Sequence, residues 1–187
     1  ASQSAGIKPI IGADLRTETP DSNDAFGNFT VLCQHYAGYQ NLSALISRCY
    51  LEGQDTGIPV AKWEWIKEFA DGLIVLSGAR EGEIGQLILA GNLEQAKQRC
   101  AEWQAVFPDR FYLELQRIGH VDDERVVQHS LQLAADLNLP VVATNASRFL
   151  ITEDFDAHEA RVCINEGRTL DDTRRPKRFT QEQYLKS

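Results

Sequence analysis

The chain contains five short apolar runs. They predict the strands of a sheet that is covered on both faces. Such strands are typically continuous apolar runs, whereas half-exposed strands alternate. The predicted strands are residues 7–13, 28–33, 73–77, 111–115 and 141–144. From residue 73 onward, strand and helix patterns alternate with short connections, which predicts right-handed crossovers and a mostly parallel sheet.

Apolar residues at helical spacing fill the segments between these strands. In the first such segment Leu42, Leu45 and Cys49 share one face. The predicted helices are residues 39–51, about 61–69, 83–90, 93–107 and 122–137, with a last one that follows Thr152. Near the end of the sequence Thr180 and Gln183 have the spacing of a capping box, so a further helix is expected to begin there.

The length of 187 residues, with 43% apolar and 25% charged residues, fits one packed globular domain. The sequence contains neither an apolar run of the roughly 18 residues that a membrane helix needs nor a secretion signal. Because Cys33, Cys49, Cys100 and Cys163 form no CxxC pair, we expect reduced core or helix-face residues in a cytoplasmic protein. The absence of methionine and the late start of the last helix suggest a fragment cut at both ends.

The formal net charge of −8 disfavours direct binding of this chain to nucleic acid, because an acidic surface repels phosphate backbones. One basic cluster stands out near the C-terminus. It comprises Arg174, Arg175, Lys177 and Arg178 and is interrupted by Pro176. The pattern favours a solvated loop, with a nucleic-acid contact as the alternative.

Residues 78–85, GAREGEIG, follow a strand and open a helix, as a phosphate-binding loop does. They lack the Lys-Ser/Thr end of a Walker loop and the spacing of a dinucleotide site. A turn with tolerated glycines is therefore favoured, and residual anion binding near Arg80 is the alternative.

Other candidate chemistry is sparse. Active sites in such folds lie beyond the carboxyl ends of the strands, where Asp14 and Glu114 could share a metal or act as acid and base. For Glu114, a hydrogen bond to a neighbouring loop is the simpler interpretation. The four histidines stand alone, so the sequence does not support a self-contained metal site.

Seven segments, spread over nearly the whole chain, carry a family pattern. They are GIKPIIGAD (residues 6–14), FTVLCQHYAGYQNLSALIS (29–47), GLIVLSG (72–78), FYLEL (111–115), LPVVATN (139–145), DAHEARVCI (156–164) and GRTLDD (167–172). In order and spacing they resemble the polymerase-and-histidinol-phosphatase (PHP) domain of bacterial DNA polymerase III alpha subunits. No single motif is decisive, but seven in sequence with little insertion make the match specific.

The resemblance implies an α/β fold, a PHP-type distorted barrel of seven β/α units. The barrel would be incomplete, because the family's first strands, with a His-x-His pair and an Asp-His pair, would precede Ala1. Residues 1–187 would then form a single PHP-domain fragment. Its C-terminal segment, residues 169–187, would lead toward the absent polymerase palm.

Metal-binding members of this family place ligands at five positions that the chain contains. Asp14 stands where an acid, usually Glu, is found, Asn28 replaces a histidine, and Ala79 stands where a cysteine is frequent. Ala146 and Arg148 replace an aspartate and a histidine. An amide oxygen substitutes poorly for imidazole, alanine offers no donor atom, and a protonated guanidinium repels a dication. We therefore expect a vestigial site, without catalytic residues, metal or cofactor, in which Arg148 pairs with Asp14.

The leading hypothesis is a noncatalytic structural and interaction domain of a replicative DNA-directed DNA polymerase. The implied partners are the rest of the alpha subunit and the proofreading exonuclease (epsilon) subunit, without a membrane or direct nucleic-acid contact. One alternative is a metal-dependent phosphoesterase or 3′ to 5′ exonuclease, which needs the ligands that this chain lacks. A third is a stand-alone α/β hydrolase-like enzyme, against which the fragment-like ends count.

Overall fold

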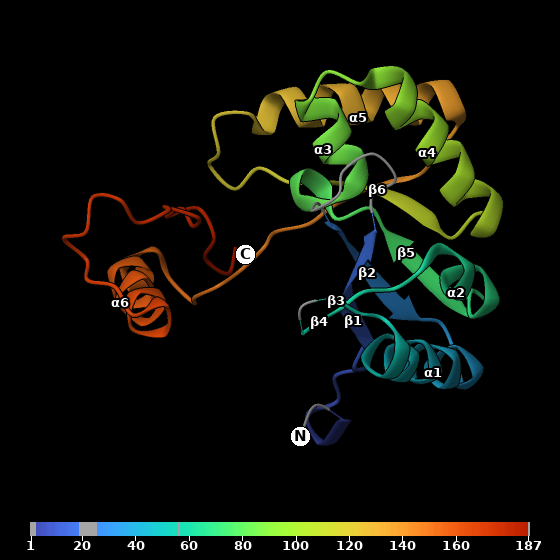
Figure 1. Cartoon of the computed structure of the whole chain (residues 1–187), viewed down its shortest axis with the longest axis horizontal. Coiled ribbons are helices and arrows are strands. Elements are labelled where there is room, and N and C mark those ends of the chain that lie inside the picture. The colour runs from blue at the N-terminus through green and yellow to red at the C-terminus, as the bar shows by residue number, and fades with distance from the viewer. Residues whose placement is uncertain (1–2, 19–25, 56, 187) are drawn as a thin grey trace.

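The computed structural model describes residues 3–18, 26–55 and 57–186, and in them a five-stranded sheet is the centre of a mixed α/β fold (Figure 1). Its strands follow the order β1-β2-β5-β6-β7. They are β1 (Gly12–Glu18), β2 (Phe26–Cys33), β5 (Leu73–Leu76), β6 (Phe111–Leu115) and β7 (Val141–Ala143). A small antiparallel pair joins β3 (Gln54–Asp55) to β4 (Ile58–Pro59).

Helices surround this sheet. They are α1 (Tyr36–Glu52), α2 (Trp63–Glu68), α3 (Glu83–Leu89), α4 (Leu93–Val106), α5 (Asp123–Leu137) and α6 (Phe155–Glu166), with short 3₁₀ turns η1 (Gln3–Ala5), η2 (Ala79–Glu81) and η3 (Thr152–Asp154). Figure 1 shows α3, α4 and α5 grouped at one end of the sheet, α1 and α2 at the other, and α6 set apart. In the described part of the chain, no helix combines the length and apolar character that crossing a membrane requires.

The predicted alternation from residue 73 onward is confirmed, since β5, β6 and β7 are parallel and connected through helices. The mostly parallel sheet is only partly confirmed. The strand β2 runs antiparallel to both of its neighbours, β1 and β5. The barrel is not confirmed either, because the described strands form an open sheet whose outer strands are β1 and β7.

The first predicted strand, residues 7–13, is wrong in its bounds. The strand begins at Gly12, and the isoleucines Ile7, Ile10 and Ile11 that suggested it are 62%, 73% and 48% exposed. Strand β1 instead extends through the polar residues 16–18, because its backbone pairs along its whole length with β2. Pairing with a distant strand outweighs the local apolar pattern here.

The helix expected from Thr180 onward is also wrong. Half of its capping box is present, because the backbone N–H of Thr180 donates to Oε1 of Gln183 at 3.0 Å. No helix follows in the described residues; Tyr184 instead forms a parallel bridge with Phe149. This bridge leaves the last residues in an extended conformation, which excludes a helical turn.

The core centres on the buried indole of Trp103. The rings of Phe29, Trp63, Phe107 and Phe111 lie with their centroids 4.8–5.9 Å from it, in tilted, edge-on and stacked arrangements. Such aromatic clusters contribute beyond the area that they bury. These residues come from β2, β6, α2 and α4 and from the end of α4, so the cluster joins the sheet to helices at both of its ends.

The expected core positions of the cysteines are largely confirmed. Cys49, Cys100 and Cys163 are buried, Cys33 is half-buried, and all four are free. Burial, together with the nearby negative charge of Glu83, raises the pKa of Cys100 to about 12. This thiol is therefore a neutral core residue at physiological pH.

A buried ion pair borders the aromatic cluster. Arg99 donates from Nε to Oε1 of Glu83 at 2.6 Å and from Nη2 to Oε2 at 3.0 Å, and both side chains are almost fully buried. The guanidinium also lies over the ring of Trp63, 4.8 Å from its centroid. Glu83 is the first residue of α3, where a carboxylate suits the positive end of the helix dipole. The pair therefore ties the start of α3 to α4.

Replacing Arg99 with methionine should destabilise the fold by about 3–5 kcal/mol, because it leaves the carboxylate of Glu83 buried and unpaired. Urea unfolding followed by circular dichroism measures this change. The matched control is Arg117→Met, which removes the exposed Arg117–Glu124 pair and should leave the unfolding midpoint unchanged. Equal effects of the two substitutions would contradict the role given to the buried pair.

Candidate functional site

The turn that follows β5 has an unusual backbone. Gly78 has a φ of 76° and Ala79 a φ of 45°, so two consecutive residues are left-handed. A Cβ atom on Gly78 would lie 2.0 Å from the carbonyl oxygen of Asn28, which only glycine avoids. The predicted turn is confirmed, but Gly78 is required in it and not merely tolerated, because the turn brings the end of β5 directly against β2.

The buried carboxylate of Glu114 on β6 holds this turn in place. Its Oε2 accepts the backbone N–H of Gly78 at 3.0 Å, and its own N–H donates to Oγ of Ser77 at 3.0 Å. Oε1 accepts Nε2 of Gln116 at 3.0 Å and the hydroxyl of Thr144. Glu114 is only 6% exposed, and these donors satisfy both of its oxygens. The expected hydrogen bond to a neighbouring loop is thus confirmed.

A polar cavity of about 570 Å³ opens beside this network. Four of the five vestigial positions line it, although they are far apart in the sequence: Asp14, Asn28, Ala146 and Arg148. The fifth, Ala79, is buried behind Gly78 and does not line the cavity. The cavity walls come from β1, β2, the ends of β5 and β6, and residues 145–148 and 183.

Two polar side chains of the cavity, those of Asp14 and Asn28, hydrogen-bond to neighbouring side chains. Oδ1 of Asp14 accepts the hydroxyl of Thr30 at 2.6 Å, and Nδ2 of Asn28 donates to Oε2 of Glu81 at 3.1 Å. Asp14 also lies within β1 rather than at a strand end, because that strand extends to Glu18 and does not end at residue 13. Both of these side chains are thus already engaged with protein groups.

The predicted pair between Arg148 and Asp14 is wrong. Both residues lie in the described part of the chain, and no ion pair there joins them. The guanidinium lies instead over the ring of Phe179, 5.6 Å from its centroid. The backbone accounts for this position of the Arg148 side chain. The N–H of Arg148 donates to the carbonyl of Gln183 at 2.7 Å, and this bond aligns residues 145–149 with the C-terminal stretch.

One cavity residue was missed by the sequence analysis. Gln183 is only 3% exposed, and its Nε2 donates to the carbonyl of Ala146 at 3.2 Å. Its capping-box spacing was the available signal, but that spacing was assigned to a helix. The hydrogen bond from Gln183 to Ala146 and a second one, from Nδ2 of Asn145 to the carbonyl of Tyr184 at 2.6 Å, attach the C-terminal stretch to one wall of the cavity.

The donor set does not fit a metal cluster. Within the described residues, no group of three or more His, Cys, Asp or Glu side chains could hold a metal ion. Two of the four histidines have other roles: Nδ1 of His35 caps α1 by accepting the N–H of Gly38, and Nδ1 of His129 contacts the carbonyl of Arg125. The cavity is therefore a poor site for a dication, with an arginine among its lining residues.

Comparison with known proteins identifies the class. Residues 1–118 match the family described as PHP domain. The chain belongs to the PHP domain family, as the sequence resemblance indicated.

Individual relatives show which members of this family the chain is similar to. The chain is 49% identical to the DNA polymerase III subunit alpha of Pseudomonas fluorescens over 98% of its length. It is 46% identical to the protein of the same name from Vibrio cholerae over 97% of its length, and 43% identical to that of Escherichia coli strain K12 over 100%. In each case the match spans 16% of the relative. The chain thus corresponds to about a sixth of the length of these relatives.

Replacing Glu114 with glutamine should lower the free energy of unfolding by about 1–3 kcal/mol, because one amide N–H₂ must then face a donor in the buried network. Urea unfolding measures the difference. Glu81→Gln makes the same chemical change at an exposed cavity residue and should have little effect. If both variants unfold at the same urea concentration as the original chain, Glu114 does not hold the turn.

Proposed function

We propose that this chain is a noncatalytic structural and interaction domain of a DNA polymerase III alpha subunit in the cytoplasm. The polymerising activity, a DNA-directed nucleotidyl transfer, would belong to the longer protein, since the chain matches only 16% of its relatives. The observation that carries the proposal is the set of side chains at the positions where the family places metal ligands. At four of five family ligand positions stand Asn28, Ala79, Ala146 and Arg148, none of which supports a metal cluster.

The alternative, a metal-dependent phosphoesterase or 3′ to 5′ exonuclease, has one observation in its favour. Three carboxylates, those of Asp14, Glu81 and Glu114, line the cavity. Each of them already accepts a hydrogen bond from a protein donor, and Glu114 is satisfied at both oxygens. Recruiting Glu114 as a ligand would release the turn at Gly78. The noncatalytic assignment requires no such rearrangement.

The proposed partner is the proofreading exonuclease (epsilon) subunit, together with the remainder of the alpha subunit. This follows from the family resemblance, in which degenerate PHP domains bind that subunit. The acidic net charge of −8 is compatible with a protein partner and unfavourable for direct contact with a nucleic-acid backbone.

The proposal predicts that a complete alpha subunit containing this domain retains the exonuclease subunit in a pull-down, and that deletion of the domain abolishes retention. Polymerase extension of a primed template is the control, because it reports whether the shortened subunit remains folded. Equal retention by an active shortened subunit would contradict the assigned partner. Arg99→Met in the complete subunit gives a second arm, since it should weaken retention by destabilising this domain alone.

A further inference from the structure

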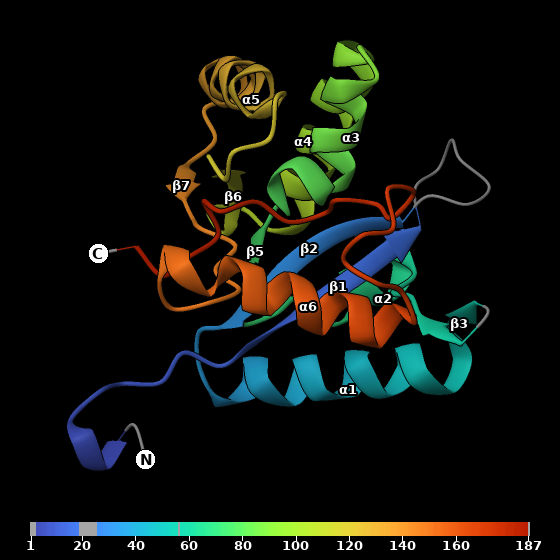
Figure 2. The ribbon, with the colours of Figure 1, turned by 90° about the vertical axis from the view of Figure 1, so that its left-hand side faces the viewer.

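The C-terminal part of the chain differs from the rest in how it is held. The helix α6 has its main contacts with the neighbouring turn η3 and not with the sheet. Figure 2 shows α6 lying in front of β1 and β2, with the C-terminal stretch turning back over it. Residues 167–179, named the strap here, follow α6 and contain neither helix nor strand.

Backbone hydrogen bonds barely attach the strap. In this fully described segment, only its first two residues donate to the helix end, from Gly167 to the carbonyl of Ile164 and from Arg168 to that of Cys163. The other two backbone bonds close turns within the strap, at Asp172 and Arg175. Side chains must therefore hold the strap against α6.

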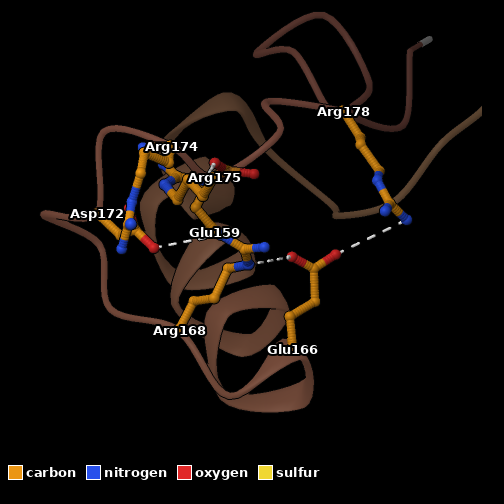
Figure 3. Close-up of polar contacts among 7 residues, drawn as sticks. All are labelled: Glu159, Glu166, Arg168, Asp172, Arg174, Arg175 and Arg178. Carbon is orange, nitrogen blue, oxygen red and sulfur yellow. Dashed lines mark hydrogen bonds and ion pairs between the residues drawn. The ribbon is translucent and has the colours of Figure 1, made fainter.

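One buried ion pair forms the centre of this attachment. Nη1 of Arg175 contacts Oε2 of Glu159 on α6, and the two side chains are only 11% and 5% exposed. Figure 3 shows the surrounding arginines and carboxylates. Arg178 contacts Glu166 at 3.7 Å across the strap, and its own side chain is 65% exposed. Exposed pairs of this kind contribute little and are screened by salt, so the buried pair is the principal ion pair between the strap and α6.

This burial corrects the expectation of a solvated loop. Of the four basic residues in the cluster, Arg174, Lys177 and Arg178 are exposed as expected, but Arg175 is inserted against α6. It is placed in the strap by its own turn, in which its N–H donates to the carbonyl of Asp172 at 3.1 Å. The basic cluster is thus anchored through one of its members.

The interior around this pair is incompletely satisfied. Oε1 of Glu159, Nε of Arg175 and both ring nitrogens of His158 are buried without a hydrogen-bond partner in the described residues. The ring of His158 packs between Phe149 and Phe179, and burial lowers its pKa. Buried polar groups without partners are costly, so the closed arrangement lies at the less stable end of the molecule.

We propose that the strap is a conformational latch, which can open away from α6 and which the ion pair between Glu159 and Arg175 holds closed. In the closed state the carboxylates of Glu159, Glu166 and Asp172 compensate the strap's positive charges. Opening releases Arg175 and Arg178 from the carboxylates of α6, whereas Arg174 and Lys177 are already exposed in the closed state. The latch therefore determines whether all four basic side chains within residues 174–178 are available together to an anionic partner.

Native-state trypsin digestion tests the latch. Cleavage after Arg174, Lys177 and Arg178 reports opening, whereas the Arg175–Pro176 bond resists trypsin, so Arg175 can be substituted without removing a cleavage site. Glu159→Gln and Arg175→Met should each accelerate strap cleavage about tenfold, because each leaves a buried partner unpaired. Replacing both residues with methionine should restore slow cleavage. Glu166→Gln, which removes only the exposed contacts, should change the rate less than about threefold.

Two outcomes would overturn the latch. One is a strap cleavage rate in both single variants that equals that of the original chain. The other is parallel acceleration at distant sites such as Lys97 and Arg117, which would show general unfolding.

Discussion

The carboxylate of Glu114 is the contact on which the geometry of the site depends. It accepts the N–H of Gly78 after β5, Nε2 of Gln116 after β6 and the hydroxyl of Thr144 after β7, so one buried side chain connects the carboxyl ends of three parallel strands. This arrangement forces the left-handed turn at residues 78 and 79 against β2. Gly78 of this turn and Glu114 both line the cavity, whose other walls come from β1, β2 and residues 145–148 and 183.

The cavity gathers positions at which the family resemblance places metal ligands. The fold brings Asp14, Asn28, Ala146 and Arg148 together from distant parts of the chain, as the family resemblance implied. Their hydrogen bonds run to protein groups, and Arg148 turns toward Phe179. The fold itself requires Glu114 and Gly78. Their contacts therefore maintain the shape of the cavity whether or not a reaction takes place there. This separation of form from activity supports the proposal of a scaffold within a larger polymerase subunit.

The sequence predicted the elements well where the pattern is local. The strands over residues 28–33, 73–77 and 111–115 and the helices over residues 83–90, 93–107 and 122–137 correspond to observed elements, because continuous apolar runs and helical spacing report burial directly. The failures involve distant partners. Pairing with β2 moved the first strand, the bridge between Phe149 and Tyr184 replaced a helix, and the same alignment turned Arg148 away from Asp14. Glu159 and Arg175 are sixteen residues apart, so only the folded chain shows that they meet.

The central claim is that the cavity has lost its capacity for divalent metal. Metal analysis of the purified chain after equilibration with zinc or manganese and removal of free ions tests it most directly. The account predicts far less than one ion per chain and no dependence on Asp14, with Asp14→Asn as the comparison. Stoichiometric metal that disappears in Asp14→Asn would contradict it and favour the phosphoesterase alternative.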